Sequence, residues 1–422
     1  MPPVRFRQLA AIGVVLACAA CATAPSPAGA ASIKVGALFP LSGPQAPLAK
    51  QEYAGVQIAR DFANGDGGVA GAPIALITKD LTSQSDAAVR VQELNAQGVH
   101  AILGSYSSSL SLPVSAEAQS RGLLYWEAGA VADQLTGRGY PLVFRVGATG
   151  QNLGTMSSHF AATVLAPRLN KSAWSLRMAI VHNLDAYPNS VASAVAQQAA
   201  IEGIQVVATV VYDAHTPDWP SVLAQVRAAK PDILVLSSYI ADGVDFRRAM
   251  LKSGLHVGAF IGSTMAQCVP DFGAMLGADA IGVFASDRPP HGFNPSALNV
   301  TGQAIYTRFA NAYRREFGSD PTEESLAGFS AAWTLFHYVM PAAGRGGDLS
   351  PRGLARAALA LDLPDGTLAN GAGVKFAATA EAMGQNIRAA SVIWQWQGVR
   401  HSVTVYPPVF ATGTPGFIPL PR

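Results

Sequence analysis

Apolar runs alternate with helical patterns along most of this chain, and together they predict its fold class. Several of the apolar runs are continuous, which is typical of parallel strands covered on both faces. Strands are expected at 33–39, 74–79, 101–103, 122–126, 142–146, 178–181, 205–211, 233–236, 259–261 and 282–285. Helices are expected at 51–64, 83–97, 113–121, 152–165, 190–202, 219–229, 243–253, 302–317 and 322–342. Repeated βα units of this kind predict an α/β fold with open parallel sheets and right-handed crossovers.

The length of the chain predicts two domains. The chain has 422 residues, half of them apolar, which is enough for two hydrophobic cores. The short stretch 146–150, Val-Gly-Ala-Thr-Gly, is the expected boundary, and no long proline- or serine-rich linker follows it. Because such a linker is missing, we expect the chain to cross between its two lobes more than once.

The beginning of the chain predicts export. Arg5 and Arg7 precede an apolar run of about 12 residues, which is too short to span a bilayer and is typical of a signal peptide. Two processing sites compete, because Cys21 resembles a lipidation site and 28–30 resembles an A-x-A cleavage site. In the first case 22–32 would be a flexible tether. The mature protein is therefore expected in the periplasm or at the cell surface, attached to a membrane at most through a lipid on Cys21.

Charge and cysteine content argue against several classes of function. The chain carries 29 basic and 27 acidic residues, and removal of Arg5 and Arg7 would make the numbers equal, so its charge gives no reason to expect nucleic acid as a partner. Cys268 is the one cysteine beyond the export segment, which excludes an internal disulfide and a multi-cysteine metal site. The histidines are scattered and none forms an i, i+4 pair, so no metal is expected.

Motifs of common enzymes are missing as well. The first strand is followed by Pro-Leu-Ser-Gly-Pro at 40–44 instead of G-x-G-x-x-G, and the chain has neither a Walker A loop nor a G-x-S-x-G elbow. We therefore expect no cofactor and no catalysis. A hydrolase that uses Glu127 or a nearby serine is the disfavoured alternative, because no base stands at a recognisable spacing.

Open parallel sheets bind ligands at the carboxyl ends of their strands, and one such end is rich in serine. Ser107, Ser108 and Ser109 lie between the strand 101–103 and Pro113, where a helix is expected to begin. Hydroxyls and unpaired amides at a helix start suit a carboxylate or carboxamide oxygen. The alternative is simple helix capping.

The next strand also ends in a candidate loop. Gly129, Ala130 and Val131 are small enough for a ligand to approach the backbone. Trp126, just before them, is either a pocket wall or a core residue. Glu127 either faces the cleft or pairs with Arg138 or Arg145.

Three residues of the second half follow strands in the same way. They are Tyr187, Tyr239 and Thr264. All three are expected where a second lobe would face the first, and the alternative for each is an ordinary loop residue.

Several of these motifs resemble those of a known family, in the same order. They are Ile33-Lys-Val-Gly-Ala-Leu-Phe-Pro-Leu-Ser-Gly-Pro44, the serine-rich loop 104–113, Gly129-Ala130 with 135–140, and Phe144-Arg145. The chain resembles the leucine/isoleucine/valine-binding proteins, which are type I periplasmic solute-binding proteins of ABC importers. The resemblance extends over about 33–405. It implies two hinged Rossmann-like lobes with three crossings, the first formed by 33–148 plus 285–383 and the second by 149–284 plus 384–422.

The resemblance also implies roles for single residues. Ser108 and the Gly129 carbonyl match positions that hold the carboxylate and amino group of the ligand, and Tyr187 and Tyr239 match positions that close over it. The family has a threonine where this chain has Val131, an acidic residue near Thr264, and an aromatic residue near Leu48.

These departures change the expected ligand, because a buried ammonium without a carboxylate is unfavourable. Unless Glu127 or Asp242 supplies that carboxylate, an amide, a urea-like compound or a carboxylate fits the residues as well as an amino acid does.

The expected function is therefore a monomeric, non-catalytic solute-binding protein. It would close on a small ligand and deliver it to an ABC permease with its ATPase. The alternative is a ligand sensor on the same fold that passes its closure to a receptor or regulator.

Overall fold

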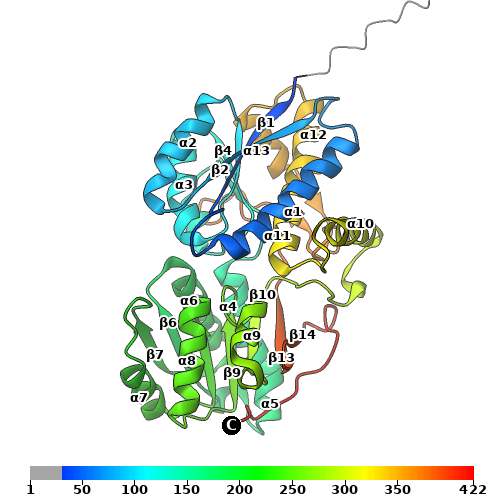
Figure 1. Ribbon diagram of the computed structural model, residues 1–422. Helices are drawn as coiled ribbons and strands as arrows, with labels where there is room; N and C mark the ends of the chain where they lie inside the picture. The colour runs from blue at the N-terminus through cyan, green and yellow to red at the C-terminus, as the bar shows by residue number, and fades with distance from the viewer. Residues whose placement is uncertain (1–30) are drawn as a thin grey trace, which may run out of the picture.

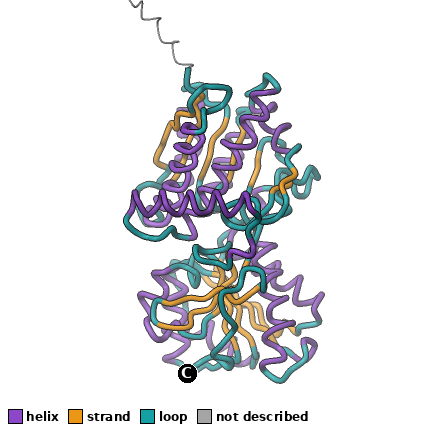
Figure 2. The backbone as a smooth tube through the Cα atoms, turned by 90° about the vertical axis from the view of Figure 1, so that its right-hand side faces the viewer, coloured by secondary structure: helices purple, strands orange, loops and turns teal. Residues whose placement is uncertain are grey.

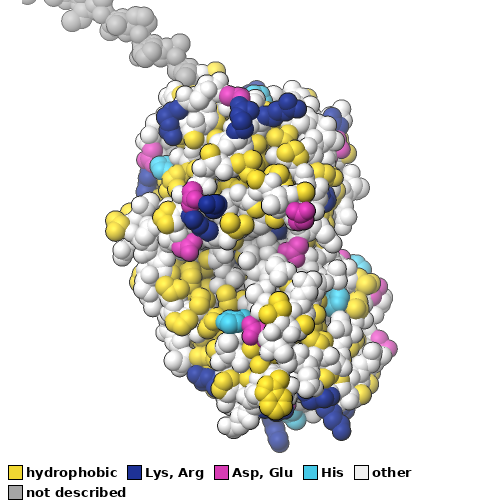
Figure 3. All heavy atoms as spheres, turned by 180° about the vertical axis from the view of Figure 1, so that it is seen from behind, with side chains coloured by type: hydrophobic (Ala, Val, Ile, Leu, Met, Phe, Trp, Pro, Cys, Tyr) yellow, Lys and Arg dark blue, Asp and Glu magenta, His cyan; other side chains and the backbone are white. Residues whose placement is uncertain are grey.

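The computed structural model describes residues 31–422, so the expected signal segment, Cys21 and both processing sites lie outside the described residues. The described chain forms two lobes, one above the other in Figure 1. Each lobe is a largely parallel sheet with helices on its faces, so the predicted α/β class and lobed architecture are confirmed. Figure 3 shows the waist between the lobes from behind, with basic and acidic side chains interspersed over that face.

The first lobe contains a five-stranded parallel sheet in the order β2-β1-β3-β4-β5. Its strands are β1 (Ile33–Phe39), β2 (Ile74–Asp80), β3 (Ala101–Gly104), β4 (Leu124–Glu127) and β5 (Val143–Arg145). Around it lie α1 (Ala46–Gly65), α2 (Ala87–Ala96), α3 (Ser108–Ser120), α10 (Val300–Phe317), α11 (Glu323–Trp333), α12 (Met340–Arg345) and α13 (Pro351–Leu359). The short pair β11 (Asp362–Leu363) and β12 (Val374–Lys375) completes it.

The core of this lobe joins segments that are distant in the sequence. Glycines let α1 and α11 pack backbone to backbone: a Cβ on Gly55 would lie 2.6 Å from the amide nitrogen of Phe329, and one on Gly328 would lie 2.8 Å from the carbonyl carbon of Glu52. Side chains at either position would push the helices apart.

The second lobe contains a seven-stranded sheet in the order β14-β13-β10-β9-β8-β6-β7. Its strands are β6 (Arg177–Asn183), β7 (Gln205–Tyr212), β8 (Ile233–Ser237), β9 (Ala259–Ser263), β10 (Phe284–Asp287), β13 (Val392–Gly398) and β14 (His401–Tyr406). Its helices are α4 (Gly150–Phe160), α5 (Ala166–Arg168), α6 (Ala186–Glu202), α7 (Trp219–Ala229), α8 (Ile240–Lys252) and α9 (Pro270–Leu276). A π-helical segment, Ala161–Leu165, joins α4 to α5.

The chain passes between the lobes at three places, all within the narrow waist that separates the lobes in Figure 2. They are 146–149 between β5 and α4, 288–299 between β10 and α10, and 376–391 between β12 and β13. The expected boundary between 284 and 285 falls inside β10, which pairs with β13 along its whole length and with β9 over 284–286, both in the second sheet.

Two parts of the sequence prediction were wrong in detail. Helix α3 begins at Ser108, five residues before Pro113, so the proline lies inside the helix. At the sixth helical position a proline lacks the amide that would donate to the carbonyl of Ser109, so α3 is short of one backbone hydrogen bond there. The tail was expected to join the second lobe without assigned strands, but it forms the antiparallel hairpin β13–β14 at the edge of the sheet. Within 31–422, no helix combines the length and apolarity needed to cross a membrane.

Candidate ligand-binding site

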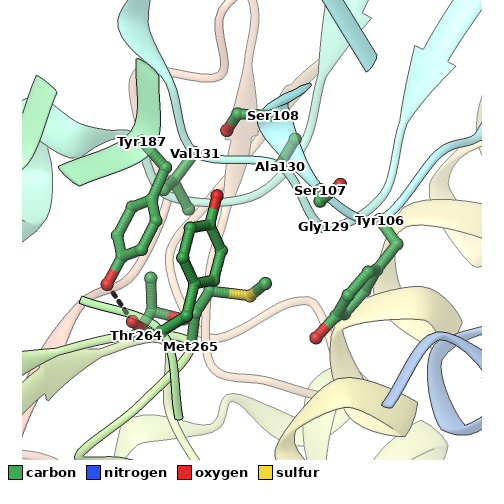
Figure 4. Close-up of a pocket in the computed structure, with 10 residues that line it drawn as sticks. Tyr106, Ser107, Ser108, Gly129, Ala130, Val131, Tyr187, Thr264 and Met265 are labelled. Carbon is green, nitrogen blue, oxygen red and sulfur yellow. Dashed lines mark hydrogen bonds between the residues drawn. The ribbon is translucent and has the colours of Figure 1, made fainter. Parts of the chain in front are cut away.

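A cavity lies between the two lobes where strand ends from both sheets converge. Its volume is about 10 Å³, measured as the space open to the centre of a water-sized sphere, which is room for roughly one water molecule. In Figure 4, Ser107 and Ser108 of the first lobe lie on one side and Thr264 and Met265 of the second on the other. Its lining consists of Tyr106, Ser107, Ser108, Gly129, Ala130, Val131, Tyr187, Tyr239, Thr264 and Met265. None of these side chains carries a charge at neutral pH.

The start of α3 supplies hydrogen-bond donors to this cavity. Ser107 is extended (φ −99°, ψ 148°) and the helix begins at Ser108, so the amides of Ser108 and Ser109 have no carbonyl within the helix to bond. Ser108 Oγ accepts a hydrogen bond from the amide of Ala132 at 3.0 Å, which leaves the hydroxyl hydrogen free to donate. An oxygen atom that enters the cavity can therefore meet three donors at this helix end.

The loop after β4 is held rigidly from two sides. Glu127 accepts hydrogen bonds from the amides of Ala128, Gly129 and Ala130 at 3.0, 2.8 and 2.8 Å. Arg145 donates to the carbonyl of Ala130 at 3.2 Å, and to the carbonyl two residues further on at 2.7 Å. Burial raises the pKa of Glu127. The carboxylate thus shapes the loop and is directed at the backbone, away from both the cavity and the arginines considered as its partners.

Gly129 is a place where the side chain of another helix approaches the cavity wall closely. A Cβ at this position would lie 2.8 Å from Glu52 Cδ and overlap its carboxylate. Arg288 Nη1 donates to the Gly129 carbonyl at 2.9 Å. The carbonyl that the family resemblance assigns to a ligand amino group is therefore already bonded to a cation.

Behind this wall lies a buried cluster of charged residues around Arg288. Its guanidinium contacts Glu323, lies 3.0 Å from Glu324 Oε2, and lies 3.7 Å from Asp287 Oδ1. Burial raises the pKa of each of these carboxyl groups. It also raises the pKa of Glu52, whose two oxygens have no hydrogen-bond partner in the described chain.

The second lobe supplies aromatic walls and one free hydroxyl. The hydroxyl of Tyr187 donates to the Thr264 carbonyl and lies 2.7 Å from Ser263 Oγ, as the dashed line to Thr264 in Figure 4 indicates. The rings of Tyr187 and Tyr239 meet edge to face, 5.5 Å apart. Thr264 is 1% exposed, and its own hydroxyl has no hydrogen-bond partner among the described residues. A ligand can bond to Thr264 Oγ1, whereas the hydroxyl of Tyr187 is engaged by the protein.

Most of the residues expected at the site lie together. Those that line the cavity are Ser107, Ser108, Gly129, Ala130, Val131, Tyr187, Tyr239 and Thr264. Ser109 lies in the groove that adjoins it.

The remaining expected residues lie elsewhere. Trp126 is in the first core, where its Nε1 donates to the Ala331 carbonyl at 2.9 Å and its ring stacks on Phe144. Asp242 accepts from the amide of Tyr239 at 2.9 Å and from the Tyr212 hydroxyl at 2.6 Å.

Two lining residues were missed in the sequence, Tyr106 and Met265. Both have left-handed backbone angles, with φ of 79° and 71°. Non-glycine residues in this region are uncommon and cluster at functional sites. The sequence gives no signal for this conformation, although Tyr106 lies inside the serine-rich loop 104–113 and Met265 directly follows Thr264.

Comparison with known proteins fits this geometry. The sequence model of the periplasmic binding protein family matches residues 32–395. The chain belongs to this family. This periplasmic binding protein is 33% identical over 399 residues to Leu/Ile/Val-binding protein homolog 8 of Brucella suis biovar 1 (strain 1330), covering 94% of this chain and 95% of that protein.

Solved structures share the fold of this periplasmic binding protein. The branched-chain amino acid transporter substrate-binding protein LivJ from Streptococcus pneumoniae, in complex with isoleucine, is 19% identical with a TM-score of 0.71, covering 89% of this chain and 100% of that one. A solute-binding protein from R. palustris in complex with benzoate is 18% identical with a TM-score of 0.70, covering 91% and 98%. At these identities the likeness supports the fold alone.

Proposed function

We propose that this protein is an exported solute-binding protein of an ABC importer, which binds a small carboxylate, amide or amino-acid-like molecule between its lobes. The observation that carries the proposal is the cavity, because both lobes contribute residues to its wall and the expected binding loops meet there. The names of the Brucella relatives and the ligands of the LivJ and R. palustris structures agree with such a role.

The binding mechanism would be closure of two lobes about the three crossings. We assign 33–148 with 288–383 to one lobe and 149–287 with 384–422 to the other. In the described state the amide of Asp133 donates to Ser190 Oγ at 3.1 Å, and the amide of Gln151 donates to Asp133 Oδ1 at 3.0 Å. Opening would break such contacts, so a ligand that bonds both lobes would favour the closed state.

The wider setting follows from the same proposal. Export would bring the protein to the periplasm or cell surface, with Cys21 as a lipid anchor in one of the two processing routes. The closed monomer would be the form that the permease and its ATPase receive. Binding without catalysis is the role that the cavity supports, because no side chain of its lining is a charged acid or base.

Isothermal titration of the mature protein with amino acids, their amides, and aliphatic and aromatic carboxylates tests this function. At least one compound should bind, and Ser108→Ala should weaken its binding by about 10-fold or more, the usual effect of losing a hydrogen bond to a charged group. Ser120→Ala, at the exposed end of the same helix, is the matched control and should bind as the native protein does. A folded protein that binds none of the compounds would refute the proposal.

A further inference from the structure

A second, larger space adjoins the cavity. It is a groove of about 440 Å³ between the start of α1 and the helices α8 and α9 of the other lobe. Pro44, Pro47 and Leu48 line it from one lobe, and Ile240 and Met275 line it from the other. Three cavity residues also line the groove, namely Tyr106, Tyr239 and Met265. The two spaces therefore adjoin at these residues, the cavity forming a polar end and the groove an apolar end.

The polar end is built to accept oxygen atoms. The amides of Ser108 and Ser109 have no partner within α3, and Ser108 Oγ is free to donate its hydrogen. The start of a helix favours a negative charge. Thr264 lines the same cavity from the other lobe, and its buried Oγ1 has no partner within hydrogen-bond distance among residues 31–422, although its hydroxyl lies near enough to the Asp287 carboxyl to lower the pKa of that group. Together these donors match a carboxylate, which accepts several hydrogen bonds.

The same end offers no counter-charge to an ammonium group. The lining contains no carboxylate, and the Gly129 carbonyl already accepts a hydrogen bond from the Arg288 cation. The carboxylates of Glu127 and Asp242 are taken up by backbone and side-chain donors of the protein. An ammonium in this cavity would be desolvated without a counter-charge, which is strongly unfavourable.

The size of the cavity indicates that a ligand extends beyond it. Ligand sites usually enclose roughly 300–1,000 Å³. The cavity alone, at about 10 Å³, falls far below that range, whereas the adjoining groove, at about 440 Å³, lies within it. Asp185 and Asp271, both exposed, line the groove and disfavour a second carboxylate there.

We propose that the ligand is a monocarboxylate without an α-ammonium group, with its carboxylate at the start of α3 and its apolar body in the groove. This inference rests on the proposed solute-binding function and narrows it. Specificity against amino acids would then arise because no acidic side chain lines the cavity to pair with an ammonium group.

The first test compares two compounds that differ by one group. L-leucine and 4-methylpentanoate share the carboxylate and the branched chain, and the second lacks the ammonium. In calorimetric titration at pH 7.4, 4-methylpentanoate should bind at least about 100-fold more tightly than L-leucine, because burying the unpaired ammonium of leucine lowers its affinity by that factor or more. The amide 4-methylpentanamide should bind up to about 10-fold more weakly than the acid, because the helix start favours the anion.

The second test measures the groove. Affinity should rise by about fourfold for each methylene from butanoate to octanoate, the gain expected for a buried methylene group. Ala241→Phe, which places a ring in the groove, should weaken octanoate but leave butanoate unchanged. Ala224→Phe on α7, exposed and outside both spaces, is the matched control and should change neither. The chain-length series on the native protein stands even if Ala241→Phe folds poorly.

The possible outcomes separate this inference from the proposed function. If L-leucine binds as tightly as 4-methylpentanoate, or more tightly, the inference is overturned while solute binding stands. The same holds if the amide binds more tightly than the acid, or if affinity is flat from butanoate to octanoate. Failure of every compound to bind a folded protein overturns the proposed function itself.

Discussion

Replacing Arg288 with methionine would leave a buried group of carboxylates without its cation. The guanidinium is 3% exposed and contacts Glu323, Glu324 and Asp287, and it also bonds the carbonyl of Gly129. Methionine keeps an unbranched apolar stem, shorter than that of arginine, and supplies neither charge nor donor. The change therefore tests whether this cluster is held together by its one cation.

The size of the effect follows from burial. Removing one partner of a buried ion pair costs about 3–5 kcal/mol, because the remaining charge is left uncompensated. The carboxyl groups of Glu323 and Glu324 can escape by taking up protons, and burial already raises the pKa of each. Without Arg288 the folded state would bind more protons than the unfolded state above pH 4.3, roughly, so the stability of the variant should fall as the pH rises.

The assay is urea unfolding followed by tryptophan fluorescence at pH 8 and pH 5.5. Arg288→Met should lose about 3–5 kcal/mol at pH 8 and clearly less at pH 5.5. The matched control is Arg314→Met, since Arg314 is half exposed and pairs with Asp320 on the surface at 2.6 Å. The control should lose less than about 1 kcal/mol at both pH values. A loss for Arg288→Met that equals the control, or that is the same at both pH values, would refute this reasoning.

Two more substitutions test the walls of the site. Glu52→Gln should stabilise the protein increasingly as the pH rises, because burial raises the pKa of Glu52 and the native protein loses stability above about pH 4.3. In urea unfolding, the variant's free energy of unfolding should exceed that of the native protein by a margin that grows by at most about 1.4 kcal/mol per pH unit. A margin that shrinks as the pH rises would contradict this prediction. Tyr187→Phe should lower the free energy of unfolding by about 1–3 kcal/mol, because it leaves the partners of the hydroxyl unbonded. It should change the affinity for 4-methylpentanoate by less than about threefold, because the ring still lines the cavity. If the binding free energy falls by more than the free energy of unfolding, the hydroxyl bonds the ligand.

The regular elements could be predicted wherever a local pattern was strong. The continuous apolar run of β1 and the Asp218-capped start of α7 gave the observed bounds. The hairpin β13–β14 was missed because a polar residue, Gln395, interrupts the apolar pattern of β13, although it lies in a buried strand. Its amide is satisfied by the carbonyls of Gly282 and Gly416, which no local pattern reveals.

In the candidate site, too, residues set by a local pattern could be predicted, whereas contacts between distant segments could not. Residues directly after strands were predictable, because parallel strands deliver their carboxyl ends to one edge of a sheet. The partners of Arg288 were not, because Glu52, Gly129 and Glu324 come from distant segments and meet only after both lobes have formed. Trp126 illustrates the remaining ambiguity: a large aromatic residue at a strand end fits a wall or a core, and its bond to the Ala331 carbonyl decides for the core.

The glycine contact between α1 and α11 has a consequence for how the chain acquires its structure. Gly55 and Gly328 are 273 residues apart in the sequence (328 − 55), so α1, the first helix of the described residues, lacks this packing partner until most of the polypeptide exists. Five parallel strands of the seven-stranded sheet come from one uninterrupted stretch, 177–287, so they can pair before the rest of the chain has been synthesised. Because distant pairings form slowly, the middle of the polypeptide is expected to acquire order before its beginning.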